Sequence, residues 1–478
     1  MEKHKIVVNA LNEIVNQKQL RKILTKQLDK YIYKKTVTEN TENLKKVQLK
    51  KHEFVSAMLY SAVRNVDKGY ISKHVIKKLV EVLVVNTFYN DENEKHVSTT
   101  DTFEKKYGQL PPSFIVLSPT QRCNLKCVGC YASSNAKTTP TLPYDIVDRI
   151  VKENHDIYGS HFVTVSGGEP FMYKNDGKTL LDIFEKYNDT FFLVYTNGTL
   201  ITKDVAKKLA ELGNVTPAIS VEGYEKETDE RRGKGVYKKI LQAFENLREV
   251  GVPFGISVTA TSKNVDILLT DEFYDLYFDK LGATYMWQFQ LMPIGRGKDT
   301  FDLMVKPEDR VKLYRKWEYV LSEKKYLVAD FWNSGVLVNG CIAYGRPNGG
   351  YIYIDWNGNI MPCVFVPYSV DNVYDLYKNG KTIADAGFSD FMKNGRKWQK
   401  DYGVSHPKTP DNWLMPCSIR DHYENFKKSI LPSNARPENK EAADIMNDKE
   451  YYEALKKYDD ELKTFTSKIW DDEYIKFN

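Results

Sequence analysis

Long hydrophobic runs are missing from this sequence of 478 residues, and cysteines are few. No apolar run approaches the roughly 20 residues that a membrane-spanning helix needs. The first residues, Met1 to Lys5, are polar and lack the apolar core of a secretory signal. Six cysteines are too few for a disulfide-rich secreted scaffold. We therefore expect a globular protein of the cytoplasm, with roughly two to four domains for its length.

Positive and negative charges nearly balance over the whole chain, but the excess of positive charge lies in its first hundred residues. The net charge is +5, whereas residues 1–100 hold nineteen Lys and Arg against eleven Asp and Glu, a local charge of +8. Such a segment suits an anionic lipid surface, nucleic acid or an acidic partner, or it is a solvated helical face. No RNA-binding module is recognisable, so no nucleic-acid partner is expected. Peripheral membrane contact through these basic helices stays open.

The spacing of apolar residues changes along the chain. Three- and four-residue spacing predicts helices at Glu53–Val63 and after Ser72, a good N-cap residue. The polar stretch Asn90 to Asp101 reads as a linker. Later, alternating residues around Asn357-Gly358 predict a hairpin over 351–363. We expect four regions: an N-terminal helical region at 1–107, a barrel at 108–325, a small α+β domain at 326–430 and a helical tail at 431–478.

Between residues 113 and 325, short apolar runs alternate with helix-length amphipathic segments. Six strand-then-helix units predict a parallel sheet with right-handed crossovers, and their number fits an open barrel better than a closed eightfold one. Ligands of such folds bind at the carboxyl ends of the strands. The expected strands are Phe114–Leu117, Phe162–Val165, Phe191–Tyr195, Ala218–Val221, Gly255–Thr259 and Tyr285–Leu291, and the expected helices lie near 143–156, 178–187, 202–212, 235–250, 269–280 and 307–323.

Three cysteines follow the first expected strand directly, with the spacing C-x3-C-x2-C: Cys123, Cys127 and Cys130. Three thiolates on a short loop can ligate three irons of a [4Fe-4S] cluster and leave the fourth iron open for chemistry. The alternative, a zinc knuckle, requires a fourth Cys or His close by, and the next candidate is His155. A disulfide would leave an odd cysteine. The spacing favours a cluster.

This loop resembles the hallmark of radical S-adenosylmethionine (radical SAM) enzymes, and the resemblance covers about residues 113–325. It implies an α/β fold, namely a partial (β/α)6 TIM-like barrel with an N-terminal helical domain and a small C-terminal α+β cluster-binding domain. It also implies reductive cleavage of SAM and abstraction of a hydrogen atom from an unactivated C–H bond. A low-potential donor such as flavodoxin or ferredoxin would supply the electron. The catalytic residues beyond the cluster remain unknown.

Further segments at successive strand ends match those that hold SAM in this family. After the second strand stands Ser166-Gly-Gly-Glu-Pro, after the third Tyr195-Thr-Asn-Gly, and after the fourth Ile219-Ser-Val-Glu-Gly. Glycines let the backbone approach a ligand closely, and a carboxylate suits the ammonium group of SAM. Each segment alone could be a simple turn. By resemblance, the cofactor-binding residues are Tyr131, Gly167, Gly168, Glu169, Pro170, Thr196, Asn197, Ser220, Glu222 and Arg232.

Two details at this expected site are less regular. Many relatives carry an aromatic residue just before the third cysteine, but here that position is Gly129 and the aromatic is Tyr131. The chain thus departs from the family pattern at the adenine contact. The segment Met292 to Arg296, which follows the sixth strand, is expected to border the adenine.

The other three cysteines, Cys341, Cys363 and Cys417, resemble the SPASM and twitch extensions of radical SAM enzymes. These extensions carry auxiliary [4Fe-4S] clusters, and three cysteines fit a single twitch-like cluster. Its fourth iron would bind a non-cysteine side chain, water or the substrate, and the side-chain candidates are Asp355, Asp421 and His422. The alternative is three small buried hydrophobic residues.

The substrate cannot be read from the residues: a peptide, a lipid and a small molecule all remain open. An alternative class is a non-catalytic iron–sulfur protein for electron transfer or redox sensing. Such a protein would need the cysteines but not the Gly-Gly-Glu-Pro segment, Ser220 or Arg232, so their presence favours the enzyme.

Overall fold

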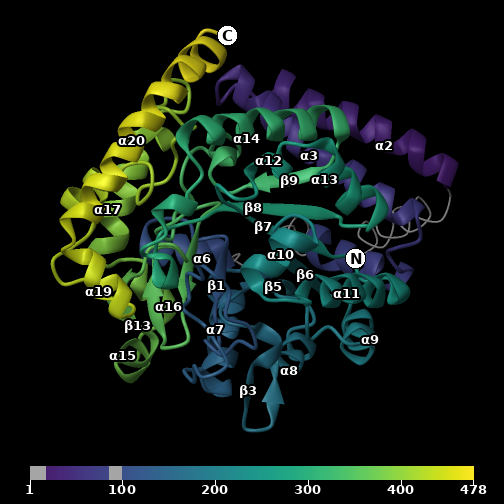
Figure 1. Cartoon of the computed structure of the whole chain (residues 1–478), viewed down its shortest axis with the longest axis horizontal. Coiled ribbons are helices and arrows are strands. Elements are labelled where there is room, and N and C mark those ends of the chain that lie inside the picture. Colours follow the sequence, from purple (N-terminus) through teal and green to yellow (C-terminus); the bar gives the residue numbers. More distant parts are fainter. Residues whose placement is uncertain (1–17, 86–98, 478) are drawn as a thin grey trace.

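A twisted, mostly parallel sheet lies at the centre of the protein, with helices around it (Figure 1). The computed structural model describes residues 18–85 and 99–477. The linker expected at Asn90–Asp101 falls largely outside these residues. Buried side chains of the sheet and the surrounding helices form one continuous hydrophobic core.

The six expected barrel strands are present, and they neighbour one another in chain order. Each pairs with the next in parallel, for example with Ile115 opposite Val163. Runs of buried β-branched and aromatic residues explain this, since strands covered on both faces need apolar side chains throughout. The strands are β1 (Phe114–Leu117), β2 (Phe162–Val165), β5 (Phe191–Thr196), β6 (Val215–Val221), β7 (Gly255–Ala260) and β8 (Tyr285–Gln290).

Amphipathic helices connect these strands and cover the outside of the sheet, so the expected partial barrel is confirmed. In α9 (Lys203–Leu212), Thr202 caps the start and Gly213 ends the helix with a φ of +70°. The other connecting helices are α7 (Tyr144–Asp156), α8 (Leu180–Lys186), α10 (Glu225–Arg232), α11 (Val236–Val250), α12 (Val265–Leu268), α13 (Asp271–Tyr274), which a wider turn continues over Asp275–Lys280, and α14 (Pro307–Tyr319).

The sheet extends on both sides beyond the six expected strands and has ten strands within the described residues. Strand β9 (Leu327–Asp330) pairs in parallel with β8, and β10 (Tyr351–Ile354) pairs in parallel with β1. The four-residue run of β9 is too short for its spacing alone to distinguish a strand from the end of the preceding helix. Because β10 belongs to the expected C-terminal hairpin, the sheet joins the two regions that carry cysteines.

The N-terminal helices α2 (Lys18–Tyr33) and α3 (Lys45–Asp67) lie on the β9 side of the barrel, where α3 contacts β9, as the purple segment near α14 in Figure 1 shows. Helix α4 (Lys73–Leu79), which Ser72 caps as expected, packs against α9, and α6 (Thr99–Tyr107) packs elsewhere, with Tyr107 stacked on Phe388. On α3, the Ser61 hydroxyl accepts a hydrogen bond of 2.9 Å from the Leu327 amide. Helix α3 thus satisfies an edge group of β9 that would otherwise be open to another chain.

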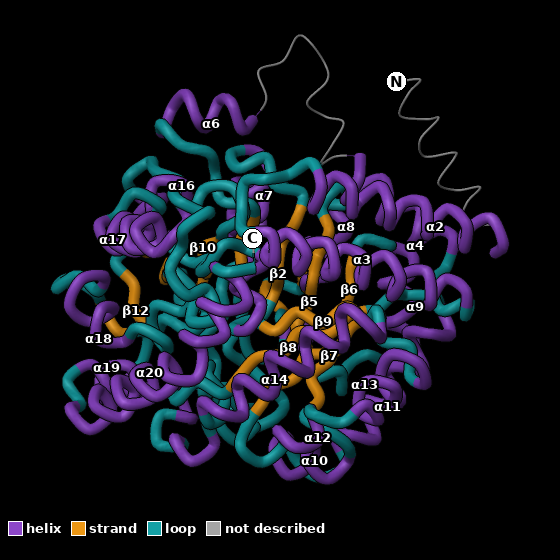
Figure 2. Tube along the Cα trace, turned by 90° about the horizontal axis from the view of Figure 1, so that it is seen from above, coloured by secondary structure: helices purple, strands orange, loops and turns teal. Residues whose placement is uncertain are grey.

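The C-terminal region begins with the expected hairpin, in which β10 pairs with β11 (Asn359–Met361). Gly358 adopts a φ of +77° in its turn. Short elements follow, and the tail is helical as expected; in Figure 2 these helices gather on one flank. They are β12 (Tyr368–Ser369), β13 (Asp371–Asn372), α15 (Val373–Lys378), α16 (Ile383–Ala386), α17 (Asp390–Gln399), α18 (Tyr423–Asn425), β14 (Arg436–Pro437), α19 (Lys440–Met446) and α20 (Lys449–Trp470).

The helices were also compared with the requirements for crossing a membrane, namely length and apolar character. None of those within residues 18–85 and 99–477 has both the length and the apolar character that crossing a bilayer demands.

Candidate functional site

A single cavity of about 730 Å³ runs from the interior of the barrel to the C-terminal region. All six cysteines line it, and so does the side of α3 that carries Lys51 and Phe54. Of the expected cofactor-binding residues, seven line this cavity: Tyr131, Gly167, Gly168, Thr196, Asn197, Ser220 and Arg232. Glu169, Pro170 and Glu222 lie behind its wall.

The first cysteine loop leaves β1 and folds over the carboxyl ends of the strands. Cys123 is buried, and its sulfur accepts a hydrogen bond from the Leu125 amide at 3.4 Å. The Asn197 side chain, at the end of β5, approaches the same sulfur at 3.8 Å. Gly129 has a φ of +66°, which lets the chain turn tightly between Cys127 and Cys130.

Arg296 braces this loop from the far side. Its guanidinium donates to the carbonyl oxygen of Cys127 at 3.0 Å and to that of Ser134, and its amide donates to the carbonyl of Cys130 at 3.1 Å. At the preceding residue, Gly295, a Cβ atom would come within 2.0 Å of the Tyr131 carbonyl oxygen. The Met292–Arg296 segment, whose expected role was an adenine contact, therefore also positions the cysteine loop.

The Gly-Gly-Glu segment after β2 packs directly against the cysteine loop. The amide of Gly168 donates to Thr120, and that of Glu169 donates to Arg122 at 2.7 Å. A Cβ at Gly168 would meet the Arg122 carbonyl at 2.2 Å, so only glycine fits there. The glycines thus permit close packing of two backbone segments at the mouth of the barrel.

The Glu169 carboxylate is fully buried and already has three donors. It accepts hydrogen bonds from the Thr196 hydroxyl at 2.7 Å, the Asn197 amide at 2.8 Å and the Phe171 amide at 3.1 Å. Burial raises its pKa to about 6 against the opposing effect of these donors. In this arrangement Glu169 ties the end of β2 to the end of β5.

Glu222, at the end of β6, holds two arginines of α10. Its Oε1 accepts from Arg231 at 2.6 Å and from Nε of Arg232 at 2.8 Å, while its buried Oε2 has no hydrogen-bond partner among the described residues. Both guanidinium groups reach the cavity wall. The pair places positive charge beside Cys127. Burial raises the pKa of the Cys127 thiol, and the charge of Arg232 opposes this shift because it favours the thiolate.

The second set of cysteines is gathered from three separate segments. Cys363 follows β11, and its sulfur accepts a hydrogen bond of 2.9 Å from the buried Tyr351 hydroxyl. Amide groups of Ala343 and Phe365 donate to the sulfurs of Cys341 and Cys363 at 3.4 and 3.5 Å. Such N–H and O–H donors around sulfur are typical of iron–sulfur sites.

Two polar side chains hold the segment around Cys341. The guanidinium of buried Arg346 donates to the carbonyls of Val338, Asn339 and Cys341, the last at 2.9 Å. The Gln399 amide donates to the carbonyls of Cys341 and Ala343. No carboxylate forms an ion pair with Arg346 among the described residues. An anionic group bound by the neighbouring thiols would supply the missing negative charge.

The side chains considered for a fourth iron ligand are occupied elsewhere. Asp355 accepts from the amides of Asn357 and Asn359 in the hairpin turn. Asp421 pairs with buried Arg310, and His422 is 2.9 Å from the Met415 carbonyl. None of the three lines the cavity.

Burial dominates the ionisation of the cysteines. Burial raises the pKa of Cys123 and that of Cys363 to about 12, and it raises the pKa of Cys417 well above the usual range. Neighbouring thiols within each set add to these shifts, because two thiolates repel each other. Ionised sulfurs are therefore unfavourable by themselves at these buried positions, and they would become favourable beside iron, which deprotonates its thiol ligands.

Sequence reasoning missed several residues in the wall between the two cysteine sets. Gln290, at the end of β8, is buried, and neither its amide nitrogen nor its amide oxygen has a partner in the described part of the chain. The indole nitrogen of buried Trp332 also lacks one. Aromatic side chains surround these groups: Trp287, Phe289, Phe331 and Phe365. The short apolar run Tyr285–Leu291 predicts the strand, but no feature of the sequence indicates an unpaired amide there.

Comparison with known proteins identifies the class. The sequence profile described as Radical SAM superfamily matches residues 117–265. Mycofactocin maturase MftC of Mycobacterium tuberculosis is 32% identical over 345 residues, which are 69% of this chain and 81% of that protein. The chain belongs to the radical SAM superfamily.

The structural comparisons agree in fold. SuiB of Streptococcus suis bound to S-adenosylmethionine has a TM-score of 0.50 at 19% identity, covering 68% of this chain and 82% of that one. The enzyme anSMEcpe with bound AdoMet and Cp18Cys peptide has a TM-score of 0.51 at 20% identity, covering 75% and 100%. The sequence profile and the MftC relative confirm the expected radical SAM enzyme with its SPASM/twitch-like extension, and these two structures agree with its fold. It uses a [4Fe-4S] cluster and S-adenosylmethionine.

Proposed function

We propose that this radical SAM enzyme modifies a peptide, and that its two cysteine sets hold two clusters. Cys123, Cys127 and Cys130 would ligate the cluster that binds SAM, and Cys341, Cys363 and Cys417 an auxiliary [4Fe-4S] cluster. The observation that carries the proposal is the single cavity that all six cysteines share with the expected SAM residues. A substrate in this cavity can contact both sites.

The residues of the chain itself would bind SAM and the substrate and hold them in position. When bound, the cluster and SAM supply an electron and a 5'-deoxyadenosyl radical able to take a hydrogen atom from a C–H bond. Two hydrogen bonds hold the mouth of the barrel beside the cysteine loop. The Asn197 side chain donates to that of Asn124 at 2.8 Å, and the Gly168 amide donates to the Thr120 carbonyl. The Arg232 guanidinium is placed to bind a carboxylate such as that of SAM. The aromatic wall excludes water, which favours close contact between substrate and cofactor.

The wall of the cavity supports a peptide as the substrate. A peptide offers apolar side chains for the aromatic wall and backbone N–H and C=O groups for the unpaired amide of Gln290 and the indole of Trp332. A saturated lipid chain would leave both polar groups unpaired, at a cost of about 1–3 kcal/mol each. Two of the neighbours in fold, SuiB and anSMEcpe, have been observed with bound peptides.

The membrane role considered for the N-terminal helices has less support. Lys46 and Lys50 of α3 both pair with Glu318 on α14, and Lys46 also with Glu473. These cations are therefore turned inward. Liposome flotation of the whole protein at low and high salt tests what remains of this prediction.

Anaerobic reconstitution tests the proposal. We expect about eight irons per chain, together with 5'-deoxyadenosine formation in the presence of a one-electron donor such as reduced flavodoxin. Deuterated peptide pools should then transfer deuterium into 5'-deoxyadenosine. Deuterium transfer from a lipid extract but from no peptide pool would contradict the peptide, and about four irons in active protein would contradict the auxiliary cluster.

A further inference from the structure

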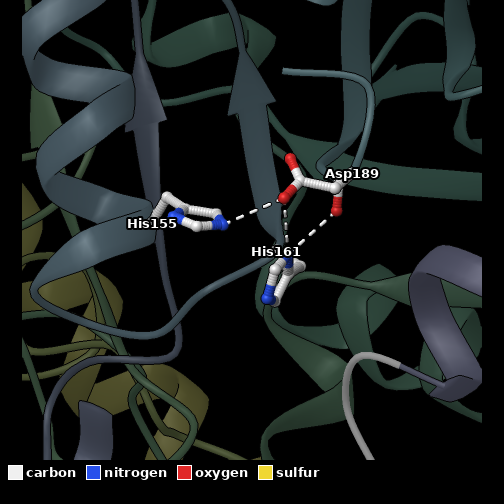
Figure 3. Close-up of side chains that lie close together, drawn as sticks. All are labelled: His155, His161 and Asp189. Carbon is white, nitrogen blue, oxygen red and sulfur yellow. Dashed lines mark hydrogen bonds and ion pairs between the residues drawn. The ribbon is translucent and has the colours of Figure 1, made fainter. Parts of the chain in front are cut away.

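A second group of metal-ligating side chains lies at the opposite end of the barrel from the cysteines. His155 is near the end of α7, His161 immediately precedes β2, and Asp189 lies in the turn before β5. Strands β2 and β5 are neighbours, and the Phe191 amide donates to the His161 carbonyl at 2.8 Å. The sheet therefore brings the three residues together at the amino ends of its strands, where Figure 3 shows both rings beside the carboxylate of Asp189.

We propose that His155, His161 and Asp189 bind a divalent transition-metal ion such as Zn²⁺. The Nε2 atom of His155 lies 3.1 Å from Oδ2 of Asp189, and Nδ1 of His161 lies 4.0 Å from the same oxygen. One ligand atom from each residue lies within 4.8 Å of the others. In a tetrahedral zinc site with bonds of about 2.0–2.2 Å, ligand atoms are roughly 3.3–3.5 Å apart. Small side-chain rotations would close the site.

The surroundings of His155 favour this geometry. Its Nδ1 lies 2.7 Å from Oδ1 of Asp156, so a carboxylate orients the ring and directs Nε2 toward Asp189. A carboxylate behind a ligating histidine is the usual arrangement in zinc sites, where it fixes the ring and raises its basicity. Lys152 pairs in turn with Asp156, which keeps that carboxylate on the far side of the ring.

His161 is the more buried of the two rings, with a side chain 17% exposed. Burial lowers its pKa, which keeps the imidazole neutral and able to donate a lone pair at neutral pH. Its Nδ1 now lies 2.9 Å from the Asp189 carbonyl oxygen. On metal binding the ring takes the tautomer with its proton on Nε2, which frees Nδ1 for the ion and gives up this hydrogen bond.

Two imidazoles and one carboxylate form the donor set of many zinc sites and leave one position for water. The ion would join the connection between α7 and β2 to the one between α8 and β5. It would act as a clip at the base of the barrel, far along the strands from the cysteine loop. We therefore expect it to affect stability and not the cleavage of SAM.

Zinc titration of cluster-loaded protein under anaerobic conditions tests the site, because bound clusters keep the six cysteines from competing. We expect one additional zinc per chain by calorimetry, and at least tenfold weaker binding in His161→Ala and in Asp189→Asn. Saturating zinc should raise the melting temperature of the wild type by a few degrees and leave both variants unchanged. His74→Ala removes another surface imidazole, which lies 3.0 Å from the Glu211 carbonyl, and should bind zinc like the wild type.

Two results would overturn the proposal. Equal zinc stoichiometry and affinity in wild type and His161→Ala would mean that the triad is only a hydrogen-bonded group. A loss of zinc in His74→Ala that matches the loss in His161→Ala would mean unspecific surface binding. Cobalt in place of zinc gives an independent reading, since its absorption bands distinguish nitrogen and oxygen ligands from sulfur.

Discussion

The two cysteine sets of this protein differ in how the chain assembles them. Cys123, Cys127 and Cys130 lie within one loop, braced by backbone contacts from the ends of neighbouring strands. Cys341, Cys363 and Cys417 come from three segments, and buried side chains such as Arg346 and Tyr351 hold them in place. The first arrangement is local, whereas the second exists only once the C-terminal region has folded.

This difference indicates a division of roles. The barrel set lines the cavity together with residues predicted to bind SAM. The C-terminal set is tied to the strand pair β10–β1, which makes it part of the wall that a substrate would touch. Removing a ligand from the first set should therefore stop SAM cleavage, and removing one from the second should leave that cleavage intact.

The largest effect is expected for Cys127→Ala. Loss of this thiolate removes a ligand of the SAM-binding cluster, so about four of about eight irons should be lost and 5'-deoxyadenosine should fall to the level without enzyme. Iron analysis and chromatography of the anaerobic protein measure both. Wild-type cleavage by Cys127→Ala protein would contradict the assignment of the barrel set.

Cys417→Ala is the matched variant in the other region. We again expect the loss of about four irons, but SAM cleavage without substrate should persist, because the hydrogen bonds of the described residues include none between the barrel loop and Cys417. Product formation with peptide should fall sharply. Circular dichroism must show native folding, since the Cys417 amide donates to Asp421 and the residue is part of the packed region. If Cys417→Ala lost cleavage as completely as Cys127→Ala, the two sets would not be separable.

The same difference decides what could be predicted from the sequence. The C-x3-C-x2-C spacing, the six strands and the glycines after β2 are local patterns, and the strands appear within a few residues of the expected positions. Strand β9 and the contact of β10 with β1 depend on pairing over long distances, which no local period reports. The unpaired amide of Gln290 is likewise visible only when the surrounding side chains are in place.

Strand β8, which lines the same cavity as both cysteine sets, gives the next largest effect. The Gln288 amide donates to buried Asp330 at 2.6 Å, whereas that of Gln290 has no partner in the described chain. Gln288→Leu should therefore destabilise the protein by about 2 kcal/mol, because a charged acceptor loses a donor. Gln290→Leu should stabilise the protein by up to about 1 kcal/mol. The same change should weaken binding of the peptide, because the Gln290 amide is proposed to bind the peptide backbone. Melting temperatures that move in the same direction would contradict this contrast.

The smallest effect concerns the potential of the auxiliary cluster. The Tyr351 hydroxyl donates to the sulfur of Cys363 at 2.9 Å, and a donor to sulfur stabilises the reduced, more negative cluster. Tyr351→Phe should therefore lower the reduction potential by about 40 mV, which corresponds to about 1 kcal/mol for one electron. Redox titration followed by EPR measures this shift. Tyr353→Phe is the matched control on the same strand, because within the described residues no hydrogen bond joins the Tyr353 hydroxyl to a cysteine sulfur. Equal potentials in both variants would mean that the hydroxyl does not act on a cluster-bound sulfur, which would remove the electrostatic reason for placing an auxiliary cluster at Cys363.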